Sequence, residues 1–333
     1  MEGLILAGDV GGTKTHLALI PAAGRGRVGA PIAEATYGTA DFPSLEAMLD
    51  AFLGAHGAGM AVAAASIGFA GAVSGGRGMG THVRWAADER SLERHLGLRR
   101  AHVINDLVAS GWGVTALPSE DLVTLFPGDP DPEGNAAVVS AGTGLGETTL
   151  VRHRGDWIPV ASEGGHADFA PRTDLEIEVF RALRARFGRV SVERVLSGIG
   201  LANIARFLHA RDGAESAWAR HEADAGPEQR RLPAIVSGQA LAGSCASCVR
   251  ALELFVGVYG AEAGNAALRG LALYGVYLGG GIAPRILPAL QGEIFSEAFR
   301  AKEPHRALLE RVPVRVVTKD RSALLGAARF ATL

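Results

Sequence analysis

The chain has 333 residues, of which 48% are hydrophobic, and this length exceeds the usual size of one compact domain, so it predicts two. A formal net charge of -2 provides no basic field for neutralising nucleic-acid phosphates, so the expected partner is a small molecule, with no nucleic acid. An amino terminus without a positive region, and apolar runs too short for a bilayer, predict a cytoplasmic protein with no membrane partner.

The first motif, GDVGGTKT at residues 8–15, comes within one residue of the Walker A pattern. A Walker loop leads into a helix, whereas this one leads into the apolar residues 16–20 and then Pro21. Because residues 3–8 also form an apolar strand, we predict a β-hairpin with a phosphate-sized turn. Gly11 and Gly12 can take positive φ there, so that backbone N–H groups converge on an anion, and an ordinary hairpin turn is the alternative.

The next elements are a strand at residues 60–69, a short helix at 91–98 and a strand at 101–104. The last of these leads directly into Asn105 and Asp106, and α/β proteins often carry catalytic residues just past a strand end. Asp106 is also suited to capping the helix that follows it. The two interpretations stay open at this point.

A second strand, glycine turn, strand pattern spans residues 136–151, and two such hairpins would suit the binding of one polyphosphate. A third glycine turn follows a strand at 272–278 and fits either the close approach of a flat ligand such as adenine or a simple corner. The remaining predicted elements are helices at 174–187, 191–210 and 239–268, a polar insertion at 212–231, a strand at 312–317 and a helix at 322–331.

The two cysteines, Cys245 and Cys248, form a C-x-x-C pair of the kind found in redox motifs and zinc sites. No second pair completes four ligands, and the apolar pattern continues through the following residues. We therefore predict two small residues on a buried helix face and no metal site built by the protein.

Six motifs resemble, in order and spacing, those of the bacterial glucokinases of the actin-like ATPase superfamily: GDVGGTKT, INDLVA, GTGLG, EGGHADFAP, SVERVLSG and LGGGIAPR. The resemblance covers nearly the whole chain. It implies an α/β protein with the two-domain actin-like ATPase (ribonuclease H-like) fold, an interdomain cleft and a C-terminal helix that packs on the N-terminal domain. We expect a small domain of residues 1–116 plus 314–333 and a large domain of residues 117–313.

The resemblance implies an ATP-dependent glucokinase that phosphorylates the 6-hydroxyl of glucose, giving glucose 6-phosphate in the first step of glycolysis. The cofactor would be ATP with Mg²⁺, and the assembly a homodimer. The positions that match the family's functional residues are Asp106 as catalytic base; Asn105, Glu163, His166 and Glu193 as glucose ligands; Gly11, Gly12 and Thr13 at the first phosphate loop; Gly142, Thr143 and Gly144 at the second; and Gly279, Gly280 and Gly281 at the adenosine turn. Asp9 and Lys14, beside the first loop, are further candidate cofactor-binding residues from their place in the sequence.

The chemistry suits these residue types, since a carboxylate can accept the proton of a sugar hydroxyl as the bond to phosphorus forms. Asp9 would touch Mg²⁺ through a water, and Lys14 either reaches the phosphates or makes a surface contact. Considered without the resemblance, Glu193 fits the solvated face of a helix and His166 fits a loop histidine with a backbone partner.

The sequence departs from the family pattern at Lys14, where many glucokinases have Asn, at Ala72, at Thr81-His82 and at Ile199. One alternative is a ROK-type kinase for another hexose or N-acetylhexosamine, although residues 163–180 lack the cysteines of that group. A second is a non-catalytic sugar-sensing relative, which usually carries a helix-turn-helix before the first strand. A third alternative is an actin-like filament protein, which would not need the EGGH motif. ADP or polyphosphate as phosphoryl donor also stays open.

Overall fold

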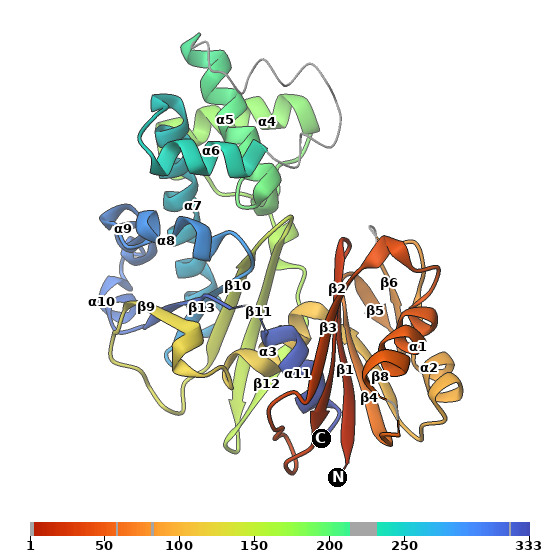
Figure 1. Ribbon diagram of the computed structural model, residues 1–333. Helices are drawn as coiled ribbons and strands as arrows, with labels where there is room; N and C mark the ends of the chain where they lie inside the picture. The colour runs from red at the N-terminus through yellow and green to blue at the C-terminus, as the bar shows by residue number, and fades with distance from the viewer. Residues whose placement is uncertain (1–2, 58, 81–82, 214–231, 320) are drawn as a thin grey trace. The chain divides into compact units, whose positions relative to one another are not determined.

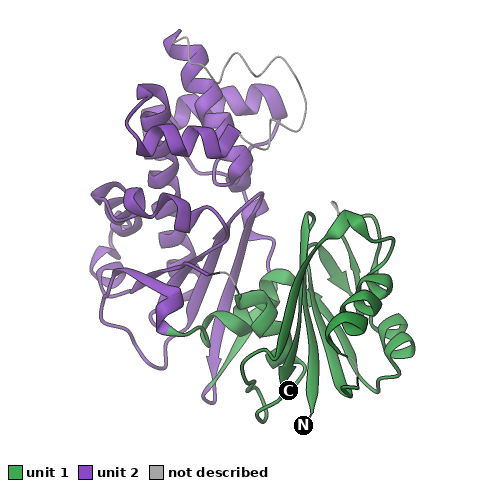
Figure 2. Cartoon of the chain, viewed as in Figure 1, with its two compact units in different colours: residues 1–118, 156–161, 320–333 green, residues 119–155, 162–319 purple. Residues whose placement is uncertain are grey.

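The computed structural model describes residues 3–57, 59–80, 83–213, 232–319 and 321–333. The chain divides into two compact units, shown in Figure 2. The first consists of residues 1–118, 156–161 and 320–333, and the second of residues 119–155 and 162–319. Each unit is an α/β structure built on its own sheet.

The sheet of the first unit has the order β3-β2-β1-β4-β8 (Figure 1). Strand β1 pairs antiparallel with β2, which confirms the hairpin around GDVGGTKT, and parallel with β4. Strand β4 pairs parallel with β8. The bounds are β1 (Leu4–Val10), β2 (Lys14–Pro21), β3 (Ala33–Gly38), β4 (Val62–Phe69) and β8 (Ala101–Asn105). A small sheet of β5 (Ala72–Ser74), β6 (Arg77–Met79) and β7 (Ala87–Asp88) completes this unit.

Alternation along β1 distributes its side chains between two hydrophobic clusters, one on each face of the sheet. Leu6 packs with residues of helices α1 (Leu45–His56) and α2 (Glu89–Leu96). Ile5 packs instead with Leu324 and Ala328 of the C-terminal helix α11 (Ser322–Phe330). The C-terminal helix therefore packs on the N-terminal sheet, as the resemblance implies.

Helix α11 also packs closely against α3 (Asp106–Val114), as Figure 1 shows. A Cβ atom on Gly113 would lie 1.9 Å from the Ser322 carbonyl oxygen, and one on Gly326 would lie 1.7 Å from the Ala109 carbonyl oxygen. These two glycines thus allow the backbones of the two helices to touch.

The second sheet has the order β12-β11-β10-β13-β14-β9, and its edge strand β12 (Asp156–Val160) is counted with the first unit. It repeats the plan of the first sheet, because an antiparallel hairpin, β10 with β11, lies beside two parallel strands, β13 and β14. The bounds are β9 (Leu122–Phe126), β10 (Ala136–Ala141), β11 (Leu145–His153), β13 (Gly275–Gly279) and β14 (Val314–Val317).

The helices of the second unit share one core with its sheet. Phe255 and Tyr259 of the long helix α7 (Ala246–Gly270) are fully buried, in the same cluster as Val139 of β10 and Leu278 of β13. The other helices are α4 (Asp174–Phe187), α5 (Gly198–Asp212), α6 (Leu232–Leu241), α8 (Leu287–Leu290), α9 (Glu293–Arg300) and α10 (Arg306–Glu310).

Two expectations from sequence need correction here, and part of a third cannot be compared with the described residues. Residues 314–319 belong to the second unit, not to the N-terminal one, because β14 pairs with β13 and β9. The helix expected at 191–210 is interrupted, since Ser197 caps α5 by accepting a hydrogen bond from the Gly200 N–H at 3.0 Å. Most of the polar insertion predicted at 212–231, and the Thr81-His82 pair, lie outside the described residues.

The helix expected at 239–268 is likewise interrupted, between α6 and α7. Cys245 is the N-cap of α7, where its Sγ accepts a hydrogen bond from the Cys248 N–H at 3.3 Å. Cys248 is fully buried on the helix, as predicted, but Cys245 is not on the helix face. Within the described ranges no single helix is long and apolar enough to cross a membrane, and only the pair α6 and α7, bent by 101°, meets the criteria together.

Candidate active site

The carboxyl ends of β1, β4 and β8 lie in register at one edge of the first sheet. Val10 pairs with Phe69, and Phe69 pairs with Asn105. The Ala70 N–H donates to the Val10 carbonyl at 2.9 Å, so the segment after β4 continues beside the phosphate hairpin. The first glycine turn and the Asn105–Asp106 pair, which are far apart in sequence, therefore lie at the same edge.

The turn of the first hairpin is closed by a hydrogen bond from the Gly11 N–H to the Lys14 carbonyl at 2.9 Å. Thr39, which the sequence analysis did not identify, supports it from the side: its hydroxyl donates to the Gly11 carbonyl at 2.7 Å, and its N–H donates to the Thr13 carbonyl at 3.1 Å. The expectation of positive φ at Gly11 and Gly12 is wrong, because neither has it. Lys14 is exposed at the start of β2.

Asn105 and Asp106 occupy the start of α3, and the structure decides which of them caps the helix. Asn105 is the N-cap, and its Oδ1 accepts hydrogen bonds from the N–H groups of Leu107 at 2.9 Å and Val108 at 3.2 Å. Its Nδ2 donates to the Gly71 carbonyl at 3.1 Å. The alternative in which Asp106 caps the helix is therefore wrong.

Asp106 is the first residue of α3, half-buried, with its Oδ1 accepting a hydrogen bond from the Leu107 N–H at 2.9 Å. A helix N-terminus stabilises negative charge, so this position favours a carboxylate. Cβ of Ala109, one turn along, leaves no room for a side chain at Gly68, where a Cβ atom would lie 3.0 Å from it. Asp106 thus lies where strand β4 and helix α3 pack closely together.

The second unit places its two glycine turns together in the same way. Ser140 at the end of β10 pairs with Gly279 at the end of β13. Gly280, with φ of 79°, packs against the Ala141 carbonyl so closely that a Cβ atom would lie 2.4 Å from it. The buried Tyr259 hydroxyl lies 3.2 Å from the Val139 carbonyl and 3.4 Å from that of Gly279. The turns at Gly142–Gly144 and Gly279–Gly281 therefore adjoin, and Gly280 requires the left-handed backbone that favours glycine.

The Gly142–Gly144 turn is held by two backbone hydrogen bonds. The Gly142 N–H donates to the Gly144 carbonyl at 2.8 Å, and the Gly198 N–H at the start of α5 donates to the Gly142 carbonyl at 2.8 Å. A helix start is thus fixed directly against the turn. A continuous helix over residues 191–210 would place Gly198 in its interior, so this contact is not predictable from the helical pattern.

The predicted sugar ligands of this unit form one cluster. His166 lies in a 3₁₀ turn, η3 (Gly164–His166), and Glu193 in a second one, η4 (Val192–Arg194). The His166 ring lies between two carboxylates, with Nε2 3.9 Å from Glu163 Oε2 and Nδ1 3.9 Å from Glu193 Oε1. Glu163 and His166 are exposed, and Glu193 is half-buried.

Glu193 also contacts the Gly142–Gly144 turn and the start of β11. Its Oε2 accepts a hydrogen bond from the Leu145 N–H at 3.0 Å, and a Cβ atom on Gly144 would lie 2.6 Å from the same oxygen. The interpretation of Glu193 as a residue on a solvated helix face is therefore wrong. Its carboxylate links the sugar cluster to the turn that would hold phosphate.

The described residues contain no group of three or more His, Cys, Asp and Glu side chains that could hold a metal ion. Asp9 is half-buried in β1, where it pairs with Gly68 and His16 of the neighbouring strands. The site residues expected from sequence thus fall into two sets, one at the sheet edge of each unit.

The chain is similar to known proteins along nearly its whole length. A family model described as glucokinase matches residues 6–333. The chain belongs to the glucokinase family. A glucokinase from Synechocystis sp. is 39% identical over 343 residues, which cover 97% of this chain and 96% of the relative.

Solved structures show the same fold as this glucokinase-family chain. A glucokinase from an Antarctic psychrotroph has a TM-score of 0.85 and 30% identity, with 99% of each chain covered. A ROK family glucokinase from Streptomyces griseus, solved in complex with glucose and AMPPNP, has a TM-score of 0.66 and 21% identity, with 99% of each chain covered. At that identity the second likeness shows a shared fold alone.

Proposed function

We propose that this glucokinase-family chain transfers the γ-phosphoryl group of ATP to the 6-hydroxyl of glucose, giving glucose 6-phosphate. The observation that carries the proposal is the Glu193 carboxylate, which accepts the Leu145 N–H of the phosphate turn and lies beside His166 of the sugar cluster. A carboxylate placed in this way fixes a sugar relative to a phosphate group. Positioning of the two reactants is the main requirement of phosphoryl transfer.

Asp106 is the proposed general base. A sugar hydroxyl is a poor nucleophile at neutral pH, and a carboxylate within hydrogen-bond reach accepts its proton as the bond to phosphorus forms. The start of α3 holds this side chain at the edge where the first phosphate hairpin lies. Asn105 would bind the sugar by giving up one of its present contacts. Either Nδ2 would leave the Gly71 carbonyl or Oδ1 would leave the N–H groups of the helix start, and that atom would then contact a sugar hydroxyl.

Glu163, His166 and Glu193 are the proposed ligands of the remaining sugar hydroxyls. Vicinal hydroxyl groups act as both donors and acceptors, and two carboxylates that flank an imidazole provide both kinds of partner. Glu163 and His166 are exposed, so that both are available to a ligand.

ATP with Mg²⁺ is the proposed phosphoryl donor. The Streptomyces griseus relative was solved with AMPPNP, which supports a nucleoside triphosphate in preference to ADP or polyphosphate. Gly11–Thr13 and Gly142–Gly144 would hold the phosphates, and Gly279–Gly281 the adenosine. Because the described residues offer no cluster of metal ligands, the nucleotide would carry Mg²⁺, with Asp9 as the carboxylate that meets its water shell. The ion would neutralise charge on the phosphates.

A cytoplasmic location and a role in the first step of glycolysis belong to the same proposal, since ATP and glucose meet in that compartment. The homodimer that the resemblance implies stays a prediction, which light scattering of the purified protein would test.

The experiment that tests the proposal is a coupled assay of ADP release with MgATP against glucose, mannose, fructose, glucosamine, N-acetylglucosamine and N-acetylmannosamine. We expect the highest kcat/KM with glucose. The highest value with an N-acetylhexosamine or fructose would instead support the ROK-type alternative. ATP binding without turnover of any sugar would support a non-catalytic relative.

A further inference from the structure

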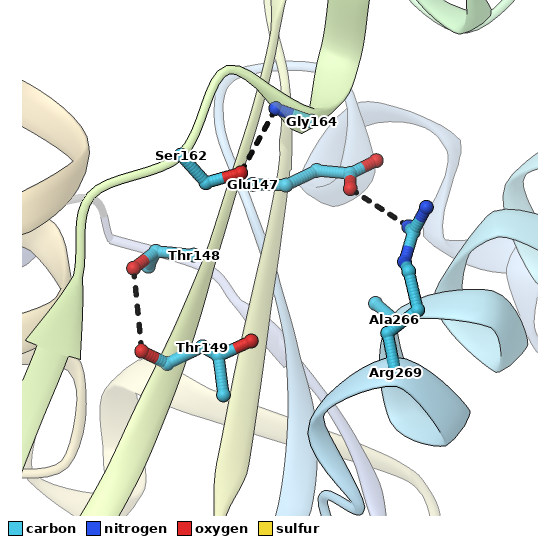
Figure 3. A pocket seen from close by; sticks show the side chains of 7 residues that line it. All are labelled: Glu147, Thr148, Thr149, Ser162, Gly164, Ala266 and Arg269. Carbon is cyan, nitrogen blue, oxygen red and sulfur yellow. Dashed lines mark hydrogen bonds and ion pairs between the residues drawn. The ribbon is translucent and has the colours of Figure 1, made fainter. Parts of the chain in front are cut away.

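A cavity of about 170 Å³ lies in the second unit directly behind residues 162–166, which we call the sugar loop. It is lined by Ser162 and Gly164 of that loop, Glu147 of β11 and Arg269 of α7 (Figure 3). Glu147 belongs to none of the functional positions expected from sequence. A charged residue at an inward position of an alternating strand was the signal that could have identified it.

Glu147 is 5% exposed, and its two carboxyl oxygens have different surroundings. Oε2 accepts a hydrogen bond from Arg269 Nη2 at 2.9 Å, the contact drawn in Figure 3. Oε1 is buried and has no hydrogen-bond partner in the described part of the chain. A buried carboxylate oxygen without a donor disfavours the ionised form of the group.

The same arginine serves a second buried carboxyl group. Arg269 Nη2 also donates to Glu262 Oε1, and Glu262 is likewise 5% exposed. Glu262 has a further donor, since Asn265 Nδ2 lies 2.9 Å from its Oε2, and Lys302 Nζ donates in turn to Asn265 Oδ1 at 2.6 Å. Glu147 therefore has fewer hydrogen-bond donors than its neighbour, and we assign a proton to its carboxyl group.

The electrostatics agree with this assignment. Burial, and next the charge of Glu262, raise the pKa of Glu147 to about 8, against a smaller lowering by Arg269, and a contact between the two carboxyl groups raises it further. The charged groups that face Glu147 are Glu262 and Arg269, both on α7. On the loop side, Ser162 and Gly164 carry no charge. The titratable groups of the loop itself, Glu163 and His166, contact each other and Glu193.

The sugar loop rests on this carboxyl group. A Cβ atom on Gly164 would lie 2.6 Å from Glu147 Oε2, and one on Gly165 would lie 2.1 Å from the Leu145 carbonyl oxygen. Ser162 Oγ accepts the Gly164 N–H at 2.9 Å, so the loop is a tight turn pressed against β11. The Glu147 carboxyl group therefore packs directly against the backbone of the segment that carries Glu163 and His166.

We propose that Glu147 is a positioning residue for sugar binding: its neutral carboxyl group supports the sugar loop, and its ionisation displaces the loop and weakens glucose binding. An ionised Glu147 must find a donor for Oε1, either by drawing water into the cavity or by turning so that Oε1 also faces Arg269. Either change moves the contact with Gly164. This inference rests on the proposed function, because it takes glucose as the ligand of the loop.

The test is KM for glucose and KM for ATP between pH 6 and pH 9 in the wild-type protein and in Glu147→Gln, which keeps the shape of the neutral acid. If only the protonated form binds sugar, the wild-type KM for glucose rises about tenfold from pH 7 to pH 9, because the competent fraction falls by that factor. We expect Glu147→Gln to remove this rise and to leave the pH dependence of KM for ATP unchanged.

Two further variants separate positioning from a general structural effect. Glu262→Gln removes the charge that raises the pKa of Glu147, so the rise in KM for glucose should begin at lower pH. The matched control is Glu176→Gln. Glu176 is another buried glutamate of this unit, on α4, and its Oε1 accepts a hydrogen bond from Arg172 Nη2 at 2.8 Å. This variant should keep the wild-type profile even where it lowers stability.

Two results would overturn the inference and leave the proposed function intact. One is the same rise in KM for glucose in Glu147→Gln as in the wild type, and the other is an unshifted rise in Glu262→Gln. Failure of the proposed function itself would be visible in the wild-type protein, as an absence of glucose turnover and glucose binding at every pH. That outcome would remove both.

Discussion

At the scale of single residues, Asp106 illustrates what neighbours decide. Its position after a strand predicted two roles, and the sequence pattern alone does not separate a catalytic base from a helix cap. The structure assigns the cap to Asn105, whose Oδ1 accepts two N–H groups of α3. Which of two adjacent polar residues caps a helix depends on backbone dihedral angles that no composition rule supplies.

Replacement of Asp106 by Ala should lower kcat by about 10²- to 10⁴-fold, the usual contribution of a general base, and change the affinity for glucose much less. Steady-state kinetics with glucose and MgATP would measure the effect. Asp106→Asn is the matched control for folding, because its side-chain oxygen can still accept the Leu107 N–H. A kcat near that of the wild type in either variant would remove Asp106 from the role of base.

At the scale of elements, periodicity located both hairpins and most helices, and α4 has the expected bounds. It failed where one apolar pattern continues across a break, as at Ser197 and Cys245, because the capping side chains at those joints are small enough to fit a helix face. The pairing of residues 314–317 with β13 depends on tertiary contacts, so the end of the second unit was not readable from the local sequence.

The contact of α3 with α11 yields a stability prediction. Gly113→Ala should destabilise the protein by about 1–3 kcal/mol or more, because the new Cβ would lie 1.9 Å from the Ser322 carbonyl oxygen and the helices must separate. The control is Gly54→Ala in α1, where no atom lies within 4 Å of an added Cβ and a gain of about 0.5–1 kcal/mol is expected. Thermal unfolding measures both, and equal effects of the two substitutions would refute the packing argument.

At the scale of the whole molecule, the raised pKa of Glu147 links stability to pH. From pH 4.5, the ordinary pKa of a glutamate, to a pH of about 8, the native chain holds a proton on Glu147. The unfolded chain has released that proton over the same pH range. This contribution to stability is therefore complete below pH 4.5 and is lost as the pH rises to about 8. Because Gln does not titrate, the melting temperature of Glu147→Gln relative to the wild type should increase steadily from pH 5 to pH 8. A difference that is constant over this range would show that Glu147 is ionised throughout.

The two sheets repeat one plan, a glycine-turn hairpin beside parallel strands, and each gathers one set of site residues at its edge. This duplication explains why the glycine motifs were readable from sequence: each fills the same topological position. Two supporting residues could not be identified from sequence, because their partners are distant in the chain. Thr39 supports the turn of the first hairpin, and Glu147 supports the sugar loop. The central claim that follows is phosphoryl transfer to a sugar hydroxyl.

The most direct test of that claim compares glucose with 6-deoxyglucose in the presence of MgATP, with ADP and glucose 6-phosphate measured in the same samples. We predict that glucose yields the two products in equal amounts. We also predict that 6-deoxyglucose yields no ADP above background and competes with glucose. Equal ADP release from both sugars, or none from glucose, would contradict the assignment of the 6-hydroxyl of glucose as the acceptor.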